Sequence, residues 1–108
     1  MFVKQLSIFV ENKKGRLAAV LKALADKNID ICALSLADTT DFGVLRVIVD
    51  KPEEAQQILR EIGVISKASN VLAVVMKDEP GSLAEILATL SEGDISVEYM
   101  YAFLGRTD

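Results

Sequence analysis

The spacing of hydrophobic and polar residues predicts a strand and then a helix at the start of the chain. Leu6, Ile8 and Val10 share one face of an extended segment, which is the pattern of a half-buried β-strand over residues 5–10. After a polar loop, the apolar residues change to the i, i+3, i+4, i+7 spacing of an amphipathic helix, at Leu17, Val20, Leu21 and Leu24. We expect this helix to end near residues 26–28.

Two paired strands, a second helix and a weak fourth strand complete the first 69 residues. Residues 29–37 and 44–49 are rich in β-branched and apolar side chains and flank turn-forming residues at 38–41. Pro52 marks a helix start, because the N–H that proline lacks is unpaired in the first turn anyway. Gly63 suits the position just past the end of this helix, and residues 64–69 are the weak strand.

The resulting order, β-α-β-β-α-β, is that of the split βαβ or ferredoxin-like arrangement of the α+β class. It predicts an antiparallel sheet of strand order 4-1-3-2 with both helices on one face.

A second copy of this pattern begins 66 residues further on. The shift superimposes identical residues: Leu72 on Leu6, Gly81 on Gly15, Leu83 on Leu17, Ala84 on Ala18, Leu87 on Leu21, Leu90 on Leu24 and Ile95 on Ile29. Because Asp108 corresponds to Phe42, the second copy contains only a strand, a helix and a strand. We therefore expect a complete module over residues 1–69 and a partial one over 70–108.

The second copy lacks the strand that would lie between its two strands and bond to both. Three explanations remain open: the chain is truncated, another chain supplies the missing strand, or the half module rearranges against residues 1–70. We expect truncation.

Composition narrows the function classes. The 108 residues are 51% hydrophobic, enough for a sizeable core, and they contain no histidine and one cysteine. Histidine-dependent triads and histidine zinc sites are thereby excluded, and Cys32, among apolar neighbours, is predicted to be a buried core thiol. The six glycines stand singly and form no phosphate-binding loop. We expect no catalysis, metal or cofactor.

The net charge of −4 argues against nucleic acid as a partner, because phosphate contacts need a basic face. The longest apolar run, Val71 to Met76, is far shorter than the roughly 20 residues of a membrane span, and the start lacks a signal peptide's apolar region. We expect a cytoplasmic protein.

At the loops before the two helices the sequence resembles the ACT domain family of small amino-acid-binding regulatory modules. Lys77–Leu83 is similar to the family's D-x-P-G-x-L loop, and Asn12–Leu17 is a looser copy with Lys14 where the family commonly has proline. The chain as a whole resembles a stand-alone tandem ACT protein. The resemblance implies homodimers formed by edge-to-edge pairing of modules, with an amino acid bound at the loop.

The resemblance places ligand-binding residues in both copies. They are Asn12, Lys14, Gly15, Arg16, Leu17 and Asp30 in the first copy, and Asp78, Gly81, Ser82, Leu83 and Ser96 in the second.

The residues at these loops also make chemical sense without the resemblance. A helix start favours a carboxylate, and a glycine removes the side chain that would block a ligand from the backbone. Asn12 and Asp78 offer oxygens to an ammonium group. A plain loop into a helix, with Asn12 and Asp78 as local caps, explains the same residues.

Lys13, Lys14 and Arg16 place three cations at a helix start, which opposes the helix dipole. They are either solvated side chains or a device that attracts a ligand carboxylate or an acidic partner surface.

The sequence therefore predicts a non-enzymatic amino-acid sensor. The alternatives are an interaction subunit without a ligand and, in the enzyme class, an isomerase or cyclase using Asp30 with Tyr99. Tyr99 and Tyr101 share one face of the last predicted strand, where they serve either packing or a subunit interface.

Overall fold

The computed structural model describes residues 1–11, 13–38 and 42–103, and it divides into two compact units, Met1–Leu72 and Ala73–Asp108. Asn12 and the predicted turn residues 39–41 lie outside the described residues.

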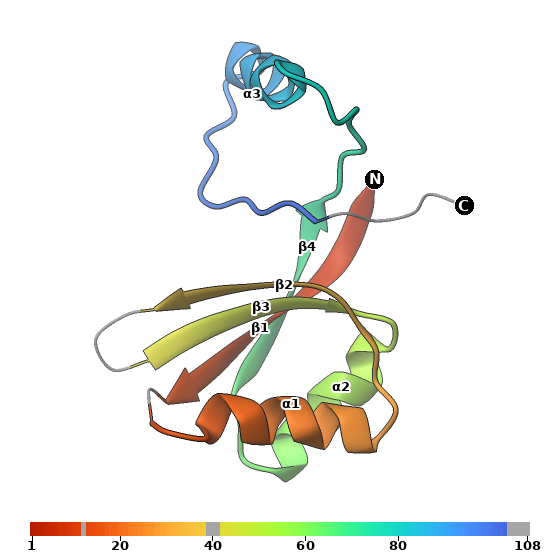
Figure 1. Cartoon of the computed structure of the whole chain (residues 1–108), viewed down its shortest axis with the longest axis vertical. Coiled ribbons are helices and arrows are strands. Elements are labelled where there is room, and N and C mark those ends of the chain that lie inside the picture. The colour runs from red at the N-terminus through yellow and green to blue at the C-terminus, as the bar shows by residue number, and fades with distance from the viewer. Residues whose placement is uncertain (12, 39–41, 104–108) are drawn as a thin grey trace. The chain divides into compact units, whose positions relative to one another are not determined.

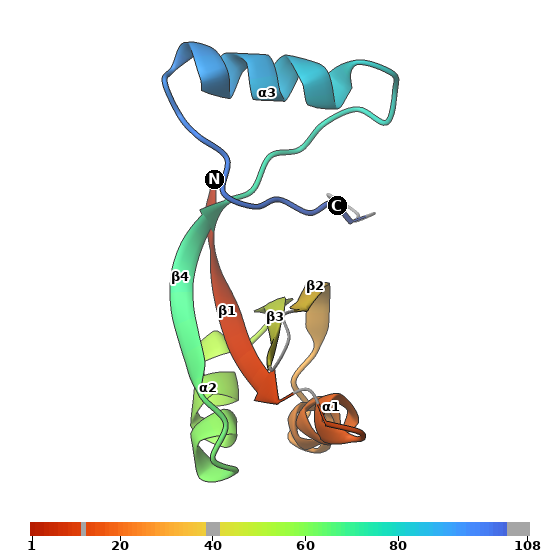
Figure 2. The ribbon, with the colours of Figure 1, turned by 90° about the vertical axis from the view of Figure 1, so that its left-hand side faces the viewer.

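The first unit has the predicted α+β fold. Its elements are β1 (Phe2–Glu11), α1 (Arg16–Asp26), β2 (Ile31–Asp38), β3 (Phe42–Val49), α2 (Pro52–Glu61) and β4 (Ser66–Leu72). The four strands form one antiparallel sheet in the order β2-β3-β1-β4, which confirms the predicted topology. Both helices lie on one face of this sheet (Figures 1 and 2).

The core of the first unit lies between the sheet and its two helices. Leu6 is opposite Val47 and Ile8 is opposite Leu45, and all four side chains are buried on the face toward the helices. The helices bury Val20, Leu24, Ala55 and Leu59 against them. The apolar residues that alternate along the strands and those spaced by about 3.6 along the helices thus form one core layer.

The three helices in the described part of the chain end in the same hydrogen-bonded turn. After α1, the Asn28 N–H donates to the Ala25 carbonyl and the Ile29 N–H to the Leu24 carbonyl, at 2.9 and 3.0 Å, with Asn28 at φ 63°. This is the Schellman arrangement, which satisfies carbonyls that a helix end leaves unpaired. Gly63, at φ 75°, occupies the left-handed position after α2, as its place in the sequence predicted.

The second unit repeats the backbone of the first around its helix α3 (Ser82–Glu92). Gly81 precedes α3 at φ 92° and ψ −14°, and Gly15 precedes α1 at φ 83° and ψ −9°. At the other end, Asp94 takes the left-handed position at φ 62°, and the Ile95 N–H donates to the Leu90 carbonyl at 2.9 Å. These positions are those of Asn28, Ile29 and Leu24 plus 66, so the internal repeat extends to backbone geometry.

The strands predicted on either side of α3 are not formed. Leu72 belongs to β4 of the first unit, where it lies opposite Phe2, and residues 73–81 and 93–103 have no strand structure. In the first unit, β3 supplies hydrogen bonds to both β1 and β2. Residues 73–103 include no strand that could supply such hydrogen bonds to the two predicted strands of the second copy.

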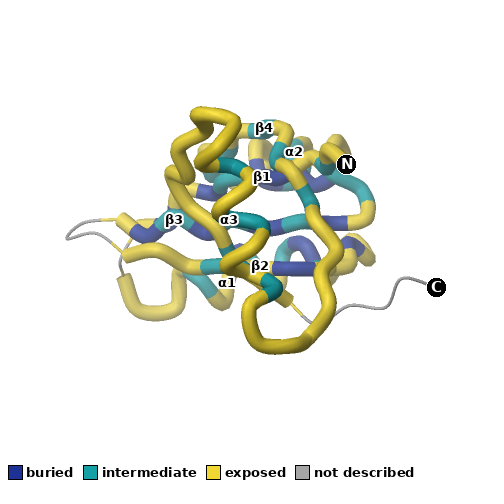
Figure 3. Tube along the Cα trace, turned by 90° about the horizontal axis from the view of Figure 1, so that it is seen from above, coloured by how far each residue is buried: buried dark blue, intermediate teal, exposed yellow. Residues whose placement is uncertain are grey.

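The apolar stripe of α3 is also less buried than that of α1. None of the α3 residues is buried, whereas α1 buries Val20 and Leu24 (Figure 3). In the first unit, α1 packs on the sheet and beside α2, whereas α3 is the one helix or strand that the second unit forms among its described residues. Similar helix sequences therefore reach different burial because their surroundings differ.

The repeat provides a matched pair of core substitutions. We expect Leu24→Ala to lower the free energy of unfolding of the first unit by about 2–5 kcal/mol, because this fully buried side chain leaves a cavity. The equivalent substitution in the second copy, Leu90→Ala, is at a half-buried position and should lower the free energy of unfolding by about 1 kcal/mol or less. Urea denaturation of both full-length variants measures the difference, and equal losses would contradict it.

Candidate functional site

The two loop glycines are required by the backbone at the helix starts. Gly15 and Gly81 have φ values of 83° and 92°, in the left-handed region that side chains other than glycine rarely adopt. A Cβ atom added at either residue would meet nothing within 4 Å. Backbone conformation therefore accounts for these glycines without the close ligand approach expected from the sequence.

The start of α1 has no side-chain cap. The Arg16 N–H donates to the Lys13 carbonyl at 3.1 Å and the Ala19 N–H donates to the Gly15 carbonyl at 3.0 Å, while no acidic residue lies in the first turn. First-turn N–H groups and the positive end of the helix dipole are thus available to an anion.

Glu11, the last residue of β1, offsets the positive charge at this helix start. Its carboxylate forms an ion pair with Lys13, with 3.2 Å between Oε2 and Nζ, and the other carboxylate oxygen lies 4.0 Å from the Arg16 guanidinium. Lys14 is exposed and forms no ion pair with the described part of the chain. Glu11 was not predicted as a partner of these cations, and its carboxylate partly balances their charge within the chain itself.

A groove of about 160 Å³ lies beside these residues, between the start of α1 and the ends of β1 and β2. Its lining is Val10, Glu11, Lys13, Leu17, Leu36, Asp38 and Gly43. Leu17 was a predicted site residue, and Lys13 was recognised as one of three unusual cations. The others were missed because β1, β2 and β3 bring them together from distant parts of the sequence.

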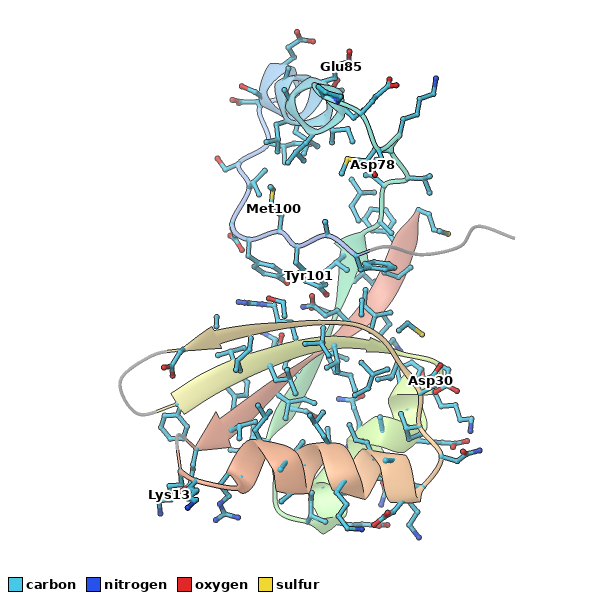
Figure 4. All side chains as sticks on the ribbon, in the orientation of Figure 1. Lys13, Asp30, Asp78, Glu85, Met100 and Tyr101 are labelled. Atoms are coloured by element: carbon cyan, nitrogen blue, oxygen red, sulfur yellow. The ribbon has the colours of Figure 1, made fainter. Side chains whose placement is uncertain are left out.

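The direction of β2 decides which acidic residue reaches this groove. Asp38 at the end of β2 lies opposite Gly43, and Gly43 lies opposite Val10 of β1. Asp30 precedes the start of β2, at the other end of α1 from Lys13 (Figure 4), where its N–H donates to the Asp50 carboxylate at 2.9 Å. An 11-residue helix is about 16 Å long, so within the first unit Asp30 does not join Gly15 and Arg16.

The predicted site residues of the second copy are likewise separated by the length of their helix. Asp78 lies in the loop before α3 (Figure 4), three residues before Gly81, and Ser82 and Leu83 belong to the first turn of the helix. Ser96 follows the opposite end of α3, so the 11-residue helix separates it from this loop. Leu83 is 41% exposed, whereas its counterpart Leu17 is half-buried and lines the groove.

A larger hollow, of about 390 Å³, lies between the end of α2 and the start of β4. Arg60 is the charged residue in its lining, and its guanidinium already donates to the Gln57 side chain at 2.8 Å. This hollow lacks the combination of both charge signs and an apolar floor that the groove at α1 offers.

Cys32 is exposed, which corrects the prediction of a buried core thiol. A β-bulge between Ile31 and Ala33 breaks the alternation of β2 at this residue. Desolvation raises the pKa of the Cys32 thiol, and the carboxylates of Asp30 and Asp50 raise it further because a thiolate would add a third negative charge. The thiol form therefore dominates at neutral pH, which disfavours nucleophilic chemistry.

Residues 1–11, 13–38 and 42–103 contain no group of three or more acidic or cysteine side chains able to hold a metal ion. In the same part of the chain, no helix has the length and apolar character needed to cross a membrane.

The fold of the first unit and its helix-start loop define a βαββαβ module. A family model described as "ACT domain pair" matches residues 1–107, so the chain belongs to this ACT domain family. The resemblance inferred from the two loops is thereby confirmed. No protein with a curated description matches the sequence.

Solved structures with the same fold include protein BT0572 from Bacteroides thetaiotaomicron. It is 42% identical, with a TM-score of 0.92 over 97% of this chain and 73% of its own. The ligand-free regulatory subunit of aspartate kinase from Thermus thermophilus is 18% identical, with a TM-score of 0.68 over 93% of this chain and 76% of its own. At that identity, the second likeness shows the fold alone.

The chemistry of Cys32 is testable through the rate at which its thiol is alkylated. Because the neighbouring carboxylates disfavour the thiolate, we expect Cys32 to react with iodoacetamide more slowly than free cysteine at pH 8, and Asp50→Asn to speed the reaction. The asparagine keeps an oxygen for the Asp30 N–H. Asp26→Asn, at an acid paired with Lys22, is the control and should change nothing. A reaction rate that is unaffected by Asp50→Asn would refute this account.

Proposed function

We propose that the protein is a regulatory module that binds an amino acid in the groove at the start of α1. The observation that carries the proposal is the joint lining of this groove by Lys13, Glu11 and Asp38 above apolar side chains, in a chain of the ACT domain family. The positive end of α1 and the Lys13 ammonium suit a carboxylate. Gly15, Arg16 and Leu17 belong to the same loop and first turn.

The module acts without catalysis of its own in this proposal. A ligand that prefers one conformation or one assembly state over another shifts the equilibrium toward it, and the shift is felt by a partner protein or by a second copy.

We also propose that modules pair edge to edge as dimers. Strand β2 is an edge of the sheet in the first unit, and Leu34 and Leu36 on it are 55% and 51% exposed. Edge strands with exposed apolar side chains favour pairing with another strand. Asp30, and Ser96 in the second copy, contribute to a ligand site where another module brings its own loop to them.

The same exposed edge supports the alternative of an interaction subunit without a small ligand. The two functions differ in their response to free amino acids. A ligand that binds the folded state stabilises it by about 2.7 kcal/mol at a concentration of 100 times Kd.

Thermal unfolding against each of the twenty amino acids tests the proposal. At saturation, we expect at least one to raise the Tm by roughly 10–20 °C, given the size of the first unit. Arg16→Glu should weaken this response by placing a negative charge at the helix start. Lys67→Glu makes the same charge reversal at an exposed residue of β4 and should leave the response intact. If no amino acid raises the Tm, the interaction subunit is favoured.

A further inference from the structure

The groove at the start of α1 is lined by three kinds of group: the Lys13 cation, the carboxylates of Glu11 and Asp38, and an apolar floor. From this arrangement we propose that it selects α-amino acids with uncharged, apolar side chains and that Asp38 receives the ligand's ammonium group. The inference rests on the proposed function and adds the ligand class and a specificity-determining residue.

Asp38 is the second carboxylate that lines the groove, beside Glu11. It lies at the end of β2, on the same face of the strand as Leu36 and opposite Gly43. Its side chain has no hydrogen bond or ion pair with any residue in the described part of the chain. The Glu11 carboxylate, by contrast, is already held by Lys13 and approached by Arg16.

Lys13 supplies the opposite charge in the same groove. Its ammonium group has three donors and directs one of them to Glu11 at 3.2 Å, so donors remain for a ligand carboxylate. Lys13 and Asp38 come from different elements, the loop after β1 and the end of β2. A zwitterion that spans the groove satisfies both charges at once.

The floor of the groove favours an apolar side chain. Val10 is buried, Leu17 is half-buried and Leu36 is 51% exposed, and none offers a polar atom. A volume of about 160 Å³ is below the roughly 300–1,000 Å³ of pockets for drug-sized ligands, so the ligand is small.

Charged side chains on the ligand are disfavoured. A second carboxylate would lie near Glu11 and Asp38 and be repelled, and a second ammonium on the apolar floor would lose hydration without a partner. A Cβ at Gly43, which also lines the groove, would lie 3.3 Å from the Leu36 Cδ1 atom and would press on this side chain of the apolar floor.

Calorimetry on the full chain with leucine and its two half-analogues tests the assignment. These analogues are 4-methylpentanoate, which lacks the ammonium group, and isopentylamine, which lacks the carboxylate. We expect leucine to bind more tightly than either analogue, aspartate or lysine. Asp38→Asn should weaken leucine binding by about tenfold or more, as loss of a charged hydrogen bond does, and leave 4-methylpentanoate binding unchanged.

Control variants separate this inference from the proposed function. Asp26→Asn removes the same charge at the far end of α1 and should leave leucine binding unchanged, and Asp38→Glu should retain most of it. If a charged amino acid binds more tightly than leucine, or Asp38→Asn has no effect while Arg16→Glu does, the inference is overturned and the proposed function stands. If no amino acid binds, both fail. Comparison of leucine with 4-methylpentanoate on the unaltered protein needs no variant and therefore does not depend on how the variants fold.

Discussion

Strand β3 is the constraint on which the organisation of the first unit depends. It is hydrogen-bonded to β2 along one edge and to β1 along the other, and both pairings are antiparallel. Strands β1 and β2 therefore run parallel to each other, so the ends that carry Glu11 and Asp38 lie at the same end of the sheet. The groove exists because one strand imposes this direction on its two neighbours.

The second unit shows what the local sequence specifies without such a strand. Gly81, the α3 helix and the left-handed Asp94 reproduce the first copy, since each depends on hydrogen bonds between residues close in sequence. The segments on either side of α3 do not form strands, because a strand depends on a partner distant in sequence. Loop and helix geometry is thus locally specified, whereas sheet geometry is not.

The same division explains which features could be predicted from the sequence. The helices could be predicted from the leucine spacing, Pro52 and Gly63, because each of these features lies within or beside the helix that it indicates. The order of helices and strands then predicted the sheet topology. Cys32 was wrongly predicted to be buried because a bulge is not visible in an alternating pattern. Asp38 was not predicted as a site residue, because its place beside the groove depends on the pairing of β2 with β3. Glu11 was not predicted as the partner of Lys13 and Arg16, because these ion pairs depend on how the chain turns between the end of β1 and the start of α1.

The pairing of Phe2 with Leu72 has a mechanical consequence. It places the start of β1 beside the residue at which the chain leaves the first unit. A pulling force on the second unit, resisted at the start of β1, would act across the last pair of the β1–β4 ladder and open it one residue pair at a time. Tension along the chain is therefore borne first by the edge strand β4, while β3 and its contacts with β1 and β2 stay intact until that strand has peeled away.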